Sequence, residues 1–462
     1  MTIKQTIPSL LAALAFCVSS ADANSEQLIS RADELTRESL VLVECKYADD
    51  SGETTLTGLG VCYDAEKGDF LTFALGPKIR RDLIRDLKVV PTGFQQEPIP
   101  AELIGTRPAV GMAFVRAKGK RAWRAVRFAR SCHVKTGQVV ASAGLMPGAR
   151  ANNRYFGLGH VSSLLRVPER IHYVTGGRLT CTGSPVFAQG SDAAIGIVYK
   201  TIYMDYQMPT SRGASMVSLK GRQESAFFMP VEEFAFVFDN VPQSGQVFRP
   251  GSLGFLKALG VSKSQSELLG IDVPAVTIDQ VIPTMPAYEA GLRNGDAIVA
   301  IDGKAIEVLS SSEFTGANLI RRIMLMSPGQ PVKVTVRRRG SDSELPMKVA
   351  EMPLLPEEAP VYTNQKLGFA MRQKVKLDMY LDQSGTGKVP GMLVTAVASD
   401  SPADDAGLKS SDVVTAVNGE TVRSVQVCRK VIAESLAADQ PKPIMLMVHR
   451  SGSEPRVVTI KP

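Results

Sequence analysis

The sequence contains the stretch MPAYEAGLRNGDAIVAIDG at residues 285–303 and repeats its pattern at residues 401–419 as SPADDAGLKSSDVVTAVNG. Several positions match at one spacing without a gap: Pro286 with Pro402, Gly291 with Gly407, Asp296 with Asp412, and Asp302 with Asn418. An apolar-Gly-Phe triplet precedes each copy, and a predicted helix and a predicted strand follow it. Self-similarity of this kind indicates a duplicated structural unit.

The repeated pattern resembles the bacterial type of PDZ domain. In that family the amides of a short apolar-Gly-apolar loop bind the carboxylate of a peptide, which then adds as a strand between a sheet edge and a helix. A glycine at the centre of the loop allows its amides to point outward. The resemblance implies two such domains, at 251–352 and 361–462, and six peptide-binding residues: Leu253, Gly254, Phe255, Leu367, Gly368 and Phe369.

The chain before the repeats reads as a series of short β-type runs. They include SLVLVECKY, TGLGVCYD, GDFLTFAL, MAFVRA, QVVASAG and AAIGIVYK, starting at residues 39, 57, 68, 112, 138 and 193. Glycine and proline punctuate them at intervals typical of an all-β barrel or sandwich. A linker beginning at Val241 ends this part of the chain.

A β-rich domain followed by two PDZ-like units resembles the HtrA (DegP-like) serine proteases. Local stretches carry the resemblance over most of residues 40–240: TGLGV from Thr57, GDFLT from Gly68, GQVVASAG from Gly137 and GHVSS from Gly159. The resemblance implies a mainly β protein. Its trypsin-like double β-barrel, at 24–240, would be followed by two PDZ domains, which are small, partly open α+β barrels.

The three positions that carry catalysis in that family are changed here. Leu75 occupies the position of the general base, Gly111 that of the orienting aspartate and Thr182 that of the nucleophile. Thr180 replaces the glycine of the oxyanion loop, and no Asp or Glu occurs between Glu102 and Glu169. A serine-type mechanism needs a base beside the nucleophile and a third group that orients it. The sequence therefore predicts a protease fold with no intact catalytic triad.

Two alternatives would restore activity. Thr182 could itself be the nucleophile, although its methyl group crowds the site and no base is identified for it. Cys181 could pair with His172, although a structural or disulfide-bonded cysteine is the simpler interpretation. The other histidines, His133, His160 and His449, do not stand at the position of the base.

Composition and the N-terminus set the class and the compartment. The 462 residues are 44% hydrophobic and 21% charged, which excludes a largely disordered or collagen-like chain. Lys4, the apolar run 7–18 and the small residues at 21–23 are typical of a cleaved signal peptide covering residues 1–23. An uncleaved anchor and lipidation at Cys17 are the alternatives. We expect a secreted or periplasmic protein.

Five cysteines remain after residue 23: Cys45, Cys62, Cys132, Cys181 and Cys428. An oxidising compartment permits disulfides, and an odd count leaves at least one thiol without a partner in the chain. Cys45 and Cys62 lie on neighbouring strand-like runs and form the favoured bridge. The connectivity of all five stays open.

Residues 103–168 combine the absence of acids with twelve basic residues in a chain of net charge +7. They are Arg107, Arg116, Lys118, Lys120, Arg121, Arg124, Arg127, Arg130, Lys135, Arg150, Arg154 and Arg166. A solvated surface and an anionic envelope partner both explain this asymmetry. No sequence pattern typical of a metal or nucleotide site is present, so no cofactor and no nucleic-acid partner are expected.

The favoured hypothesis is a pseudoprotease that binds peptide C-termini or unfolded segments through two PDZ domains. It would act as an adaptor, as a chaperone-like factor or as a regulator of active HtrA-type relatives. One alternative is an active endopeptidase in protein quality control with a Thr or Cys nucleophile. Another is an envelope scaffold that binds anionic surfaces through the basic stretch.

Overall fold

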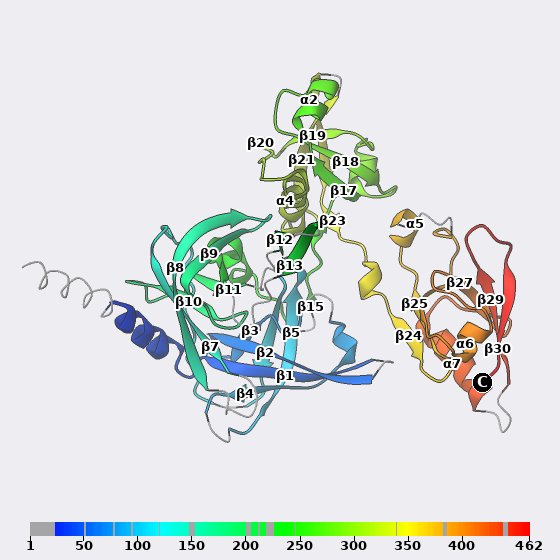
Figure 1. Ribbon diagram of the computed structural model, residues 1–462, viewed down its shortest axis with the longest axis horizontal. Coiled ribbons are helices and arrows are strands. Elements are labelled where there is room, and N and C mark those ends of the chain that lie inside the picture. Colours follow the sequence, from blue (N-terminus) through cyan, green and yellow to red (C-terminus); the bar gives the residue numbers. More distant parts are fainter. Residues whose placement is uncertain are drawn as a thin grey trace, which may run out of the picture.

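The computed structural model describes residues 24–49, 52–76, 79–93, 96–119, 121–146, 153–199, 205–210, 213–218, 226–244, 246–338, 340–381, 386–437 and 442–462. The chain forms two β-barrels and then two smaller α+β units, which are called the first and second repeat below (Figure 1). Within the described residues no helix is long and apolar enough to cross a membrane. The predicted signal peptide, residues 1–23, lies outside these ranges.

A helix over residues 24–36 precedes the first barrel. Its apolar side chains Leu28 and Ala32 are buried in one cluster with Leu59 of the first barrel and Ala141 of the second. The helix therefore packs where the two barrels meet, and its apolar face is buried against side chains of both barrels.

The first barrel has six strands and is closed because β5 pairs with both β4 and β6. The strands are β1 (Leu40–Asp49), β2 (Gly52–Asp64), β3 (Asp69–Thr72), β4 (Ile84–Pro91), β5 (Ile99–Arg107) and β6 (Met112–Ala117). The short strand β15 (Gln246–Val247) adds in parallel to β5. The 3-10 helices η1 (Arg81–Leu83) and η2 (Pro108–Val110) lie in its loops.

The second barrel is closed in the order β10-β11-β14-β9-β8-β7. Its strands are β7 (Val139–Leu145), β8 (Arg154–Arg166), β9 (Arg170–Arg178), β10 (Pro185–Ala188), β11 (Gly196–Val198) and β14 (Phe227–Pro230). A separate hairpin, β12 (Asp205–Thr210) and β13 (Gly213–Ser218), lies between β11 and β14 in sequence, and η3 (Val231–Glu233) and η4 (Ala235–Phe238) follow β14. Two closed six-stranded barrels confirm the predicted double-barrel fold.

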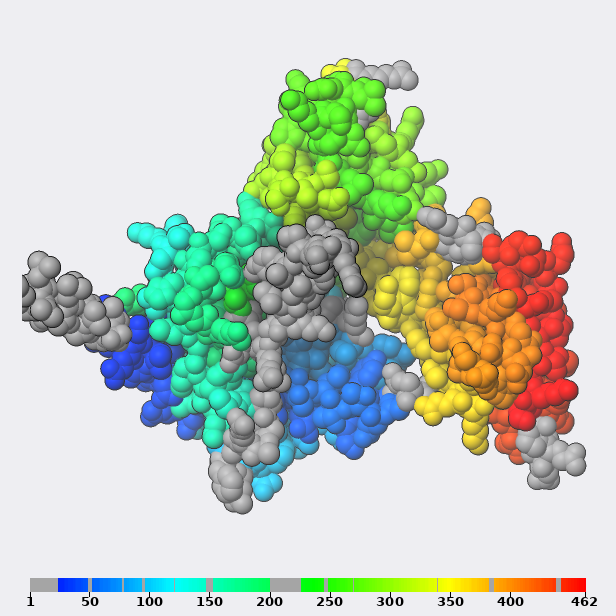
Figure 2. Space-filling view, in the orientation of Figure 1, coloured from blue at the N-terminus to red at the C-terminus, as the bar shows by residue number. Residues whose placement is uncertain are grey.

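The first repeat follows in the chain and lies against the barrels (Figure 2). The ion pair of Arg321 with Glu233 is one contact between them. Its strands are β16 (Gly251–Ser252), β17 (Phe255–Gly260), β18 (Val276–Val281), β19 (Ala297–Ile301), β20 (Lys304–Ala305), β21 (Pro331–Arg338), β22 (Ser341–Lys348) and β23 (Ala350–Glu351). Its helices are α2 (Lys263–Leu269), α3 (Pro286–Glu289) and α4 (Ser312–Met324).

The second repeat follows a linker that contains η5 (Pro356–Glu358) and has the same order of elements, except that no strand of its described residues corresponds to β23. Its strands are β24 (Val361–Asn364), β25 (Phe369–Gln373), β26 (Met392–Val397), β27 (Val413–Val417), β28 (Glu420–Thr421), β29 (Ile444–His449) and β30 (Arg456–Ile460). Its helices are α5 (Asp378–Leu381), α6 (Pro402–Asp405) and α7 (Val425–Leu436).

The structure explains why the matched residues recur in both repeats. Pro286 and Pro402 begin α3 and α6, at the first helical position, where a proline loses no helical hydrogen bond. Asp296 and Asp412 each accept a bidentate arginine, Arg338 in the first repeat and Arg450 in the second. Each arginine also donates to the carbonyl of the matched glycine, Gly291 or Gly407. The repeated acid therefore holds the turn after the short helix to the end of the sheet.

The predicted Cys45–Cys62 bridge is wrong. Cys45 pairs with Leu56 across the β1–β2 ladder, so Cys62 lies six residues further along β2 than the partner of Cys45. Successive residues of a strand advance about 3.3 Å, which is too far over six residues for a disulfide. All five cysteines are free thiols. Burial raises the pKa of Cys62 and Cys428 to about 12, which keeps both protonated at neutral pH.

The two repeats contact each other through a small apolar cluster. Ile282 and Met285 of the first repeat are buried there against Leu377 and Tyr380, which flank or belong to α5 of the second. Lys376 Nζ also donates to Thr284 Oγ1 at 2.9 Å. Since α5 and the residues before it make this contact, interactions that fix the position of α5 also stabilise the contact between the repeats.

We expect acid to loosen α5 through Asp378. Burial by itself raises the pKa of this carboxyl group, but hydrogen bonds from Arg372 and from the Val375 amide outweigh it and lower the pKa. A lowered folded-state pKa gives stability that is present above the ordinary aspartate pKa of about 3.9 and is lost as the pH falls through the folded value. Urea unfolding of the parent and of Asp378→Asn should show a smaller loss of stability below about pH 4 in the variant. Equal acid dependence would contradict the assignment.

Candidate functional site

The three positions of the expected triad lie on loops of the two barrels. Leu75 follows β3 and is buried, with 2% of its surface exposed, in the apolar core of the first barrel. Gly111 ends η2 in the left-handed conformation, with φ 71°. Thr182 is half-buried in the loop between β9 and β10. No hydrogen bond joins the Thr182 side chain to a histidine in the part of the chain that the structure describes.

Phe73, which the sequence did not single out, lies between these loops. A Cβ atom at Gly111 would lie 3.9 Å from Phe73 Cδ1, and a Cβ atom at Gly183 would lie 3.3 Å from Phe73 Cδ2. The phenyl ring therefore separates the loop that carries Gly111 from the loop that carries Thr182. An aromatic ring offers neither a base nor an acid, so the side chain between these two loops is apolar.

Three amides in the loop that would form an oxyanion hole make hydrogen bonds within the protein. Thr180 is fully buried, and both its amide (2.8 Å) and its hydroxyl (3.0 Å) donate to Ser142 Oγ. The amide of Gly183 donates to the carbonyl of Val198, and that of Ser184 donates to the carbonyl of Cys181. Oxyanion stabilisation requires backbone donors aimed at the substrate. The Thr180 amide, which stands at one of the two donor positions, is committed to Ser142.

The alternative Cys181–His172 pair is not assembled. Cys181 Sγ lies 3.4 Å from Ser184 Oγ and 3.9 Å from the carbonyl oxygen of Leu145. His172 is buried on β9 and stacks on Phe228 with 4.9 Å between the ring centroids. Burial lowers the pKa of His172. Among the described residues, no hydrogen bond connects the thiol to this imidazole or to His133, His160 or His449.

The first apolar-Gly-Phe loop precedes β17. Leu253 is buried, Phe255 is half-buried, and Gly254 adopts a φ of 96°. The Gly254 amide donates to Ser252 Oγ at 3.2 Å, and the side chain of Met285 covers the glycine, where a Cβ atom would come within 2.1 Å of Met285 Cβ. The loop of the first repeat is therefore capped by its own neighbours.

Helix α4 rests directly on β17 in the first repeat. A Cβ atom at Gly316 would lie 1.9 Å from the carbonyl oxygen of Ala258, and one at Gly260 would lie 2.8 Å from Thr315 Cβ. These two glycines allow the helix backbone to touch the strand. Neighbouring strands need a spacing of about 4.8 Å, so this edge has no room for an added strand.

The second apolar-Gly-Phe loop precedes β25. Leu367 and Phe369 are both buried, and Gly368 has a φ of 75°. A Cβ atom at Gly368 would lie 2.2 Å from Ser401 Cβ, so only glycine fits against the start of α6. Strand β25 pairs with β26 at one edge and with β24 at the other.

The basic residues of 103–168 are largely bound within the molecule. Five of them form ion pairs with carboxylates outside the stretch: Arg116 with Asp69, Lys118 with Glu102, Arg130 with Asp239, Arg154 with Asp33 and Arg166 with Glu307. Arg107 lies over the ring of Phe248, 3.6 Å from its centroid. Lys120 and Arg150 are outside the described residues. The anionic-surface partner stays a prediction.

Comparison with known proteins agrees with the two halves of this fold. Residues 257–349 and 393–448 each match the PDZ domain model. A periplasmic DegP-like serine endoprotease of Chlamydia trachomatis is 31% identical over 229 residues, which are 49% of this chain and 42% of the relative. A relative of the same name from Bartonella henselae is 25% identical over 381 residues, 78% of this chain and 67% of the relative.

Solved structures of similar fold include a Ser-to-Ala variant of the HtrA-type protease AlgW with a decapeptide. It superposes with a TM-score of 0.53 at 20% identity and covers 73% of this chain and 99% of AlgW. AlgW with a tripeptide gives a TM-score of 0.52 at 18% identity, covering 71% and 98%. The Chlamydia relative is matched over less than half of its own length.

Proposed function

We propose that this chain, which has two PDZ domains and is homologous to the DegP-like serine endoproteases, is a periplasmic pseudoprotease that binds peptides. The catalytically degenerate barrel domain would span residues 24–240, and the PDZ domains would span residues 251–352 and 361–462. Peptide C-termini or unfolded segments would bind at Leu253, Gly254, Phe255, Leu367, Gly368 and Phe369. Binding at the first three would require α4 to move away from β17, because the Gly316 and Gly260 contacts close that edge. The role would be that of an adaptor, a chaperone-like factor or a regulator of active relatives.

The single observation that carries the proposal is which residues occupy and surround the expected positions of the triad. Leu75 and Gly111 offer neither a base nor an orienting carboxylate, and Phe73 lies between the two loops. The Thr180 amide is hydrogen bonded to Ser142, so an oxyanion would lack one of the usual donors. A hydroxyl nucleophile at Thr182 would therefore lack its base, its orienting group and one of its oxyanion donors.

Peptide binding and location are supported by the relatives. The structural neighbour AlgW was solved with a decapeptide and with a tripeptide, and both repeats match the PDZ model. The curated relatives are named periplasmic. Transfer of the peptide-binding role and of the compartment to this chain rests on those likenesses.

The test is casein hydrolysis by the purified chain beside its Thr182→Ala and Cys181→Ala variants. We expect turnover at the buffer background in all three, because neither candidate nucleophile has a base. An active DegP-like endoprotease serves as the positive control in the same assay. Turnover that one substitution abolishes would refute the proposal and identify the nucleophile, and turnover that survives both substitutions would refute it by placing the nucleophile elsewhere.

A further inference from the structure

Strand β24 occupies the edge of the second PDZ domain to which a peptide would add. It runs antiparallel to β25 in an unbroken register, with Tyr362 opposite Met371 and Asn364 opposite Phe369. The other edge of β25 pairs with β26. A peptide that binds by strand addition needs a free edge of the sheet. Both edges of β25 are already used.

The end of β24 also takes the amides of the apolar-Gly-Phe loop. The Gly368 amide donates to the carbonyl oxygen of Asn364 at 2.9 Å, and the Leu367 amide donates to Asn364 Oδ1 at 3.0 Å. Asn364 thus presents two oxygens to adjacent loop amides, as the carboxylate of a peptide C-terminus would. The polarity agrees as well, because the C-terminal end of β24 lies at the loop.

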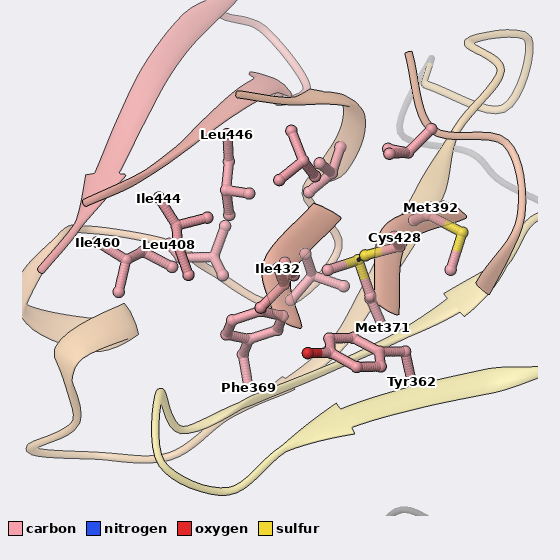
Figure 3. Packing of buried hydrophobic residues seen from close by; sticks show 14 of the residues in the cluster. Tyr362, Phe369, Met371, Met392, Leu408, Cys428, Ile432, Ile444, Leu446 and Ile460 are labelled. Carbon is pink, nitrogen blue, oxygen red and sulfur yellow. Dashed lines mark hydrogen bonds between the residues drawn. The ribbon is translucent and has the colours of Figure 1, made fainter. Parts of the chain in front are cut away.

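Tyr362 supplies the side chain that fills the apolar site beneath α7. It is 6% exposed and shares a cluster with Phe369, Met371 and Cys428 of α7. Its ring meets that of Phe369 edge-on, with 6.1 Å between centroids. Figure 3 shows both rings and the side chains of Met371 and Cys428 on the same side of the two strands.

The geometry points to residues 361–364 as a built-in ligand of the second PDZ domain, which an external peptide must displace. This inference rests on the proposed peptide-binding function and adds a regulation to it. Displacement is feasible because β24 is four residues long and follows a linker that contains Pro353, Pro356 and Pro360. No strand among the described residues pairs with its outer edge. Prolines have no amide hydrogen to donate, so the linker is held to its surroundings by few hydrogen bonds. Displacement would break the hydrogen bond of the Gln373 amide to the Pro360 carbonyl and the ion pair of Arg249 with Glu358.

The first PDZ domain has no such removable segment. Its corresponding edge, on β17, is covered by α4, and the Gly316 and Gly260 contacts described above hold the helix there. The strand before its loop, β16, pairs with β23 instead of β17. Competition between a peptide and the chain itself is therefore specific to the second domain.

The test uses a disulfide that locks β24 in place. Thr363 and Ala370 face each other across the ladder, so Thr363→Cys with Ala370→Cys can form a reversible cross-strand bridge. The probe is a labelled peptide with the sequence of residues 358–364, EAPVYTN, and a free C-terminal carboxylate. Binding is measured by fluorescence polarisation on the full chain. We expect binding to fall by about tenfold or more in the oxidised variant and to return with dithiothreitol, because only the open fraction of the domain can bind.

A second variant opens the groove. Tyr362→Ala with Asn364→Ala removes the apolar anchor and the two acceptors of the loop amides, and should bind the same peptide about tenfold more tightly than the parent. If the substitutions weaken the fold, the peptide should raise the melting temperature of this variant more than that of the parent, because it replaces the missing strand. The matched control, Leu259→Cys with Thr277→Cys across β17 and β18, should leave peptide binding unchanged in both redox states.

The outcomes separate the inference from the proposed function. Equal peptide affinity in the parent, the locked and the opened variants would overturn the built-in ligand while leaving peptide binding established. Absence of binding to the opened variant, with its fold intact by circular dichroism, would overturn the inference and remove the second groove from the proposed function. Tighter binding to the opened variant than to the parent, together with binding to the locked variant that returns on reduction, supports both the inference and the proposed function.

Discussion

A chain that carries Leu75→His, Gly111→Asp and Thr182→Ser together is expected to show no casein turnover and to be less stable than the parent. Leu75 is buried among apolar side chains, and an imidazole without a partner there costs about 1–3 kcal/mol. Gly111 has a positive φ, which adds strain for a residue with a side chain. We expect a total loss of about 2–4 kcal/mol in urea unfolding. The sequence would again contain the His, Asp and Ser of the triad, but their side chains would not be arranged for catalysis.

Two features are expected to prevent proteolysis in the triple variant: the Phe73 ring and the hydrogen-bonded amide of Thr180. Phe73 stays between the two loops in the triple variant, and Ser142 keeps the amide that an oxyanion would need. Thr182→Ser alone is the control, because it removes one methyl group from a half-buried side chain and should change stability little. The prediction would be contradicted by casein turnover in the triple variant that is lost when alanine replaces the serine at position 182. That result would show that the three substituted side chains can assemble into a working triad.

Much of the architecture follows from local patterns in the sequence. The runs beginning at Ser39, Met112 and Gln138 became β1, β6 and β7 within one or two residues, because alternating apolar residues and flanking turns decide a barrel strand locally. The duplicated Pro, Gly and Asp positions predicted two equivalent units, and each of them forms the same turn and ion pair.

The contents of the sites could not be predicted, since they depend on contacts between distant segments. Phe73 precedes Leu75 by two residues, yet its ring meets Gly111 and Gly183, and no local pattern encodes that meeting. Ser142 reads as an ordinary strand residue, but its hydroxyl accepts the Thr180 amide from another loop. The Cys45–Cys62 prediction failed for a similar reason, because short spacing along the chain did not fix the register of the ladder.

The sequence also did not predict that the peptide-binding edge of each PDZ domain is covered by another part of the chain. The two apolar-Gly-Phe loops are nearly identical in sequence, which predicts two equivalent grooves. One edge is covered by α4 because Gly316 and Gly260 permit contact between backbones, and the other by β24 because Asn364 completes a hairpin with the loop. A single glycine in a predicted helix gives a weak signal of close packing, and it would have been the only hint.

Among single substitutions, the largest loss of stability is expected for Asp412→Ala in the second PDZ domain. Asp412 is fully buried and accepts Arg450 Nε at 2.6 Å, Arg450 Nη2 at 2.7 Å and the Lys409 amide at 2.8 Å. Removing one partner of a buried ion pair costs about 3–5 kcal/mol, because the remaining charge and the amide lose their acceptor. We expect a value near 3 kcal/mol, since the Arg450 side chain is 22% exposed and water can reach it. Urea unfolding followed by circular dichroism measures the loss.

Asp296→Ala in the first PDZ domain is the matched control, because Asp296 makes the same ion pair with Arg338 at a more solvent-exposed position. Its side chain is 8% exposed and that of Arg338 is 34% exposed, against 0% and 22% for Asp412 and Arg450. The same truncation should therefore cost less in the first domain, by about 1 kcal/mol. Equal losses would mean that the shared turn, and not the burial of the charge, sets the cost. The double variant Asp412→Ala with Arg450→Met should recover part of the loss, because it leaves no unpaired guanidinium behind.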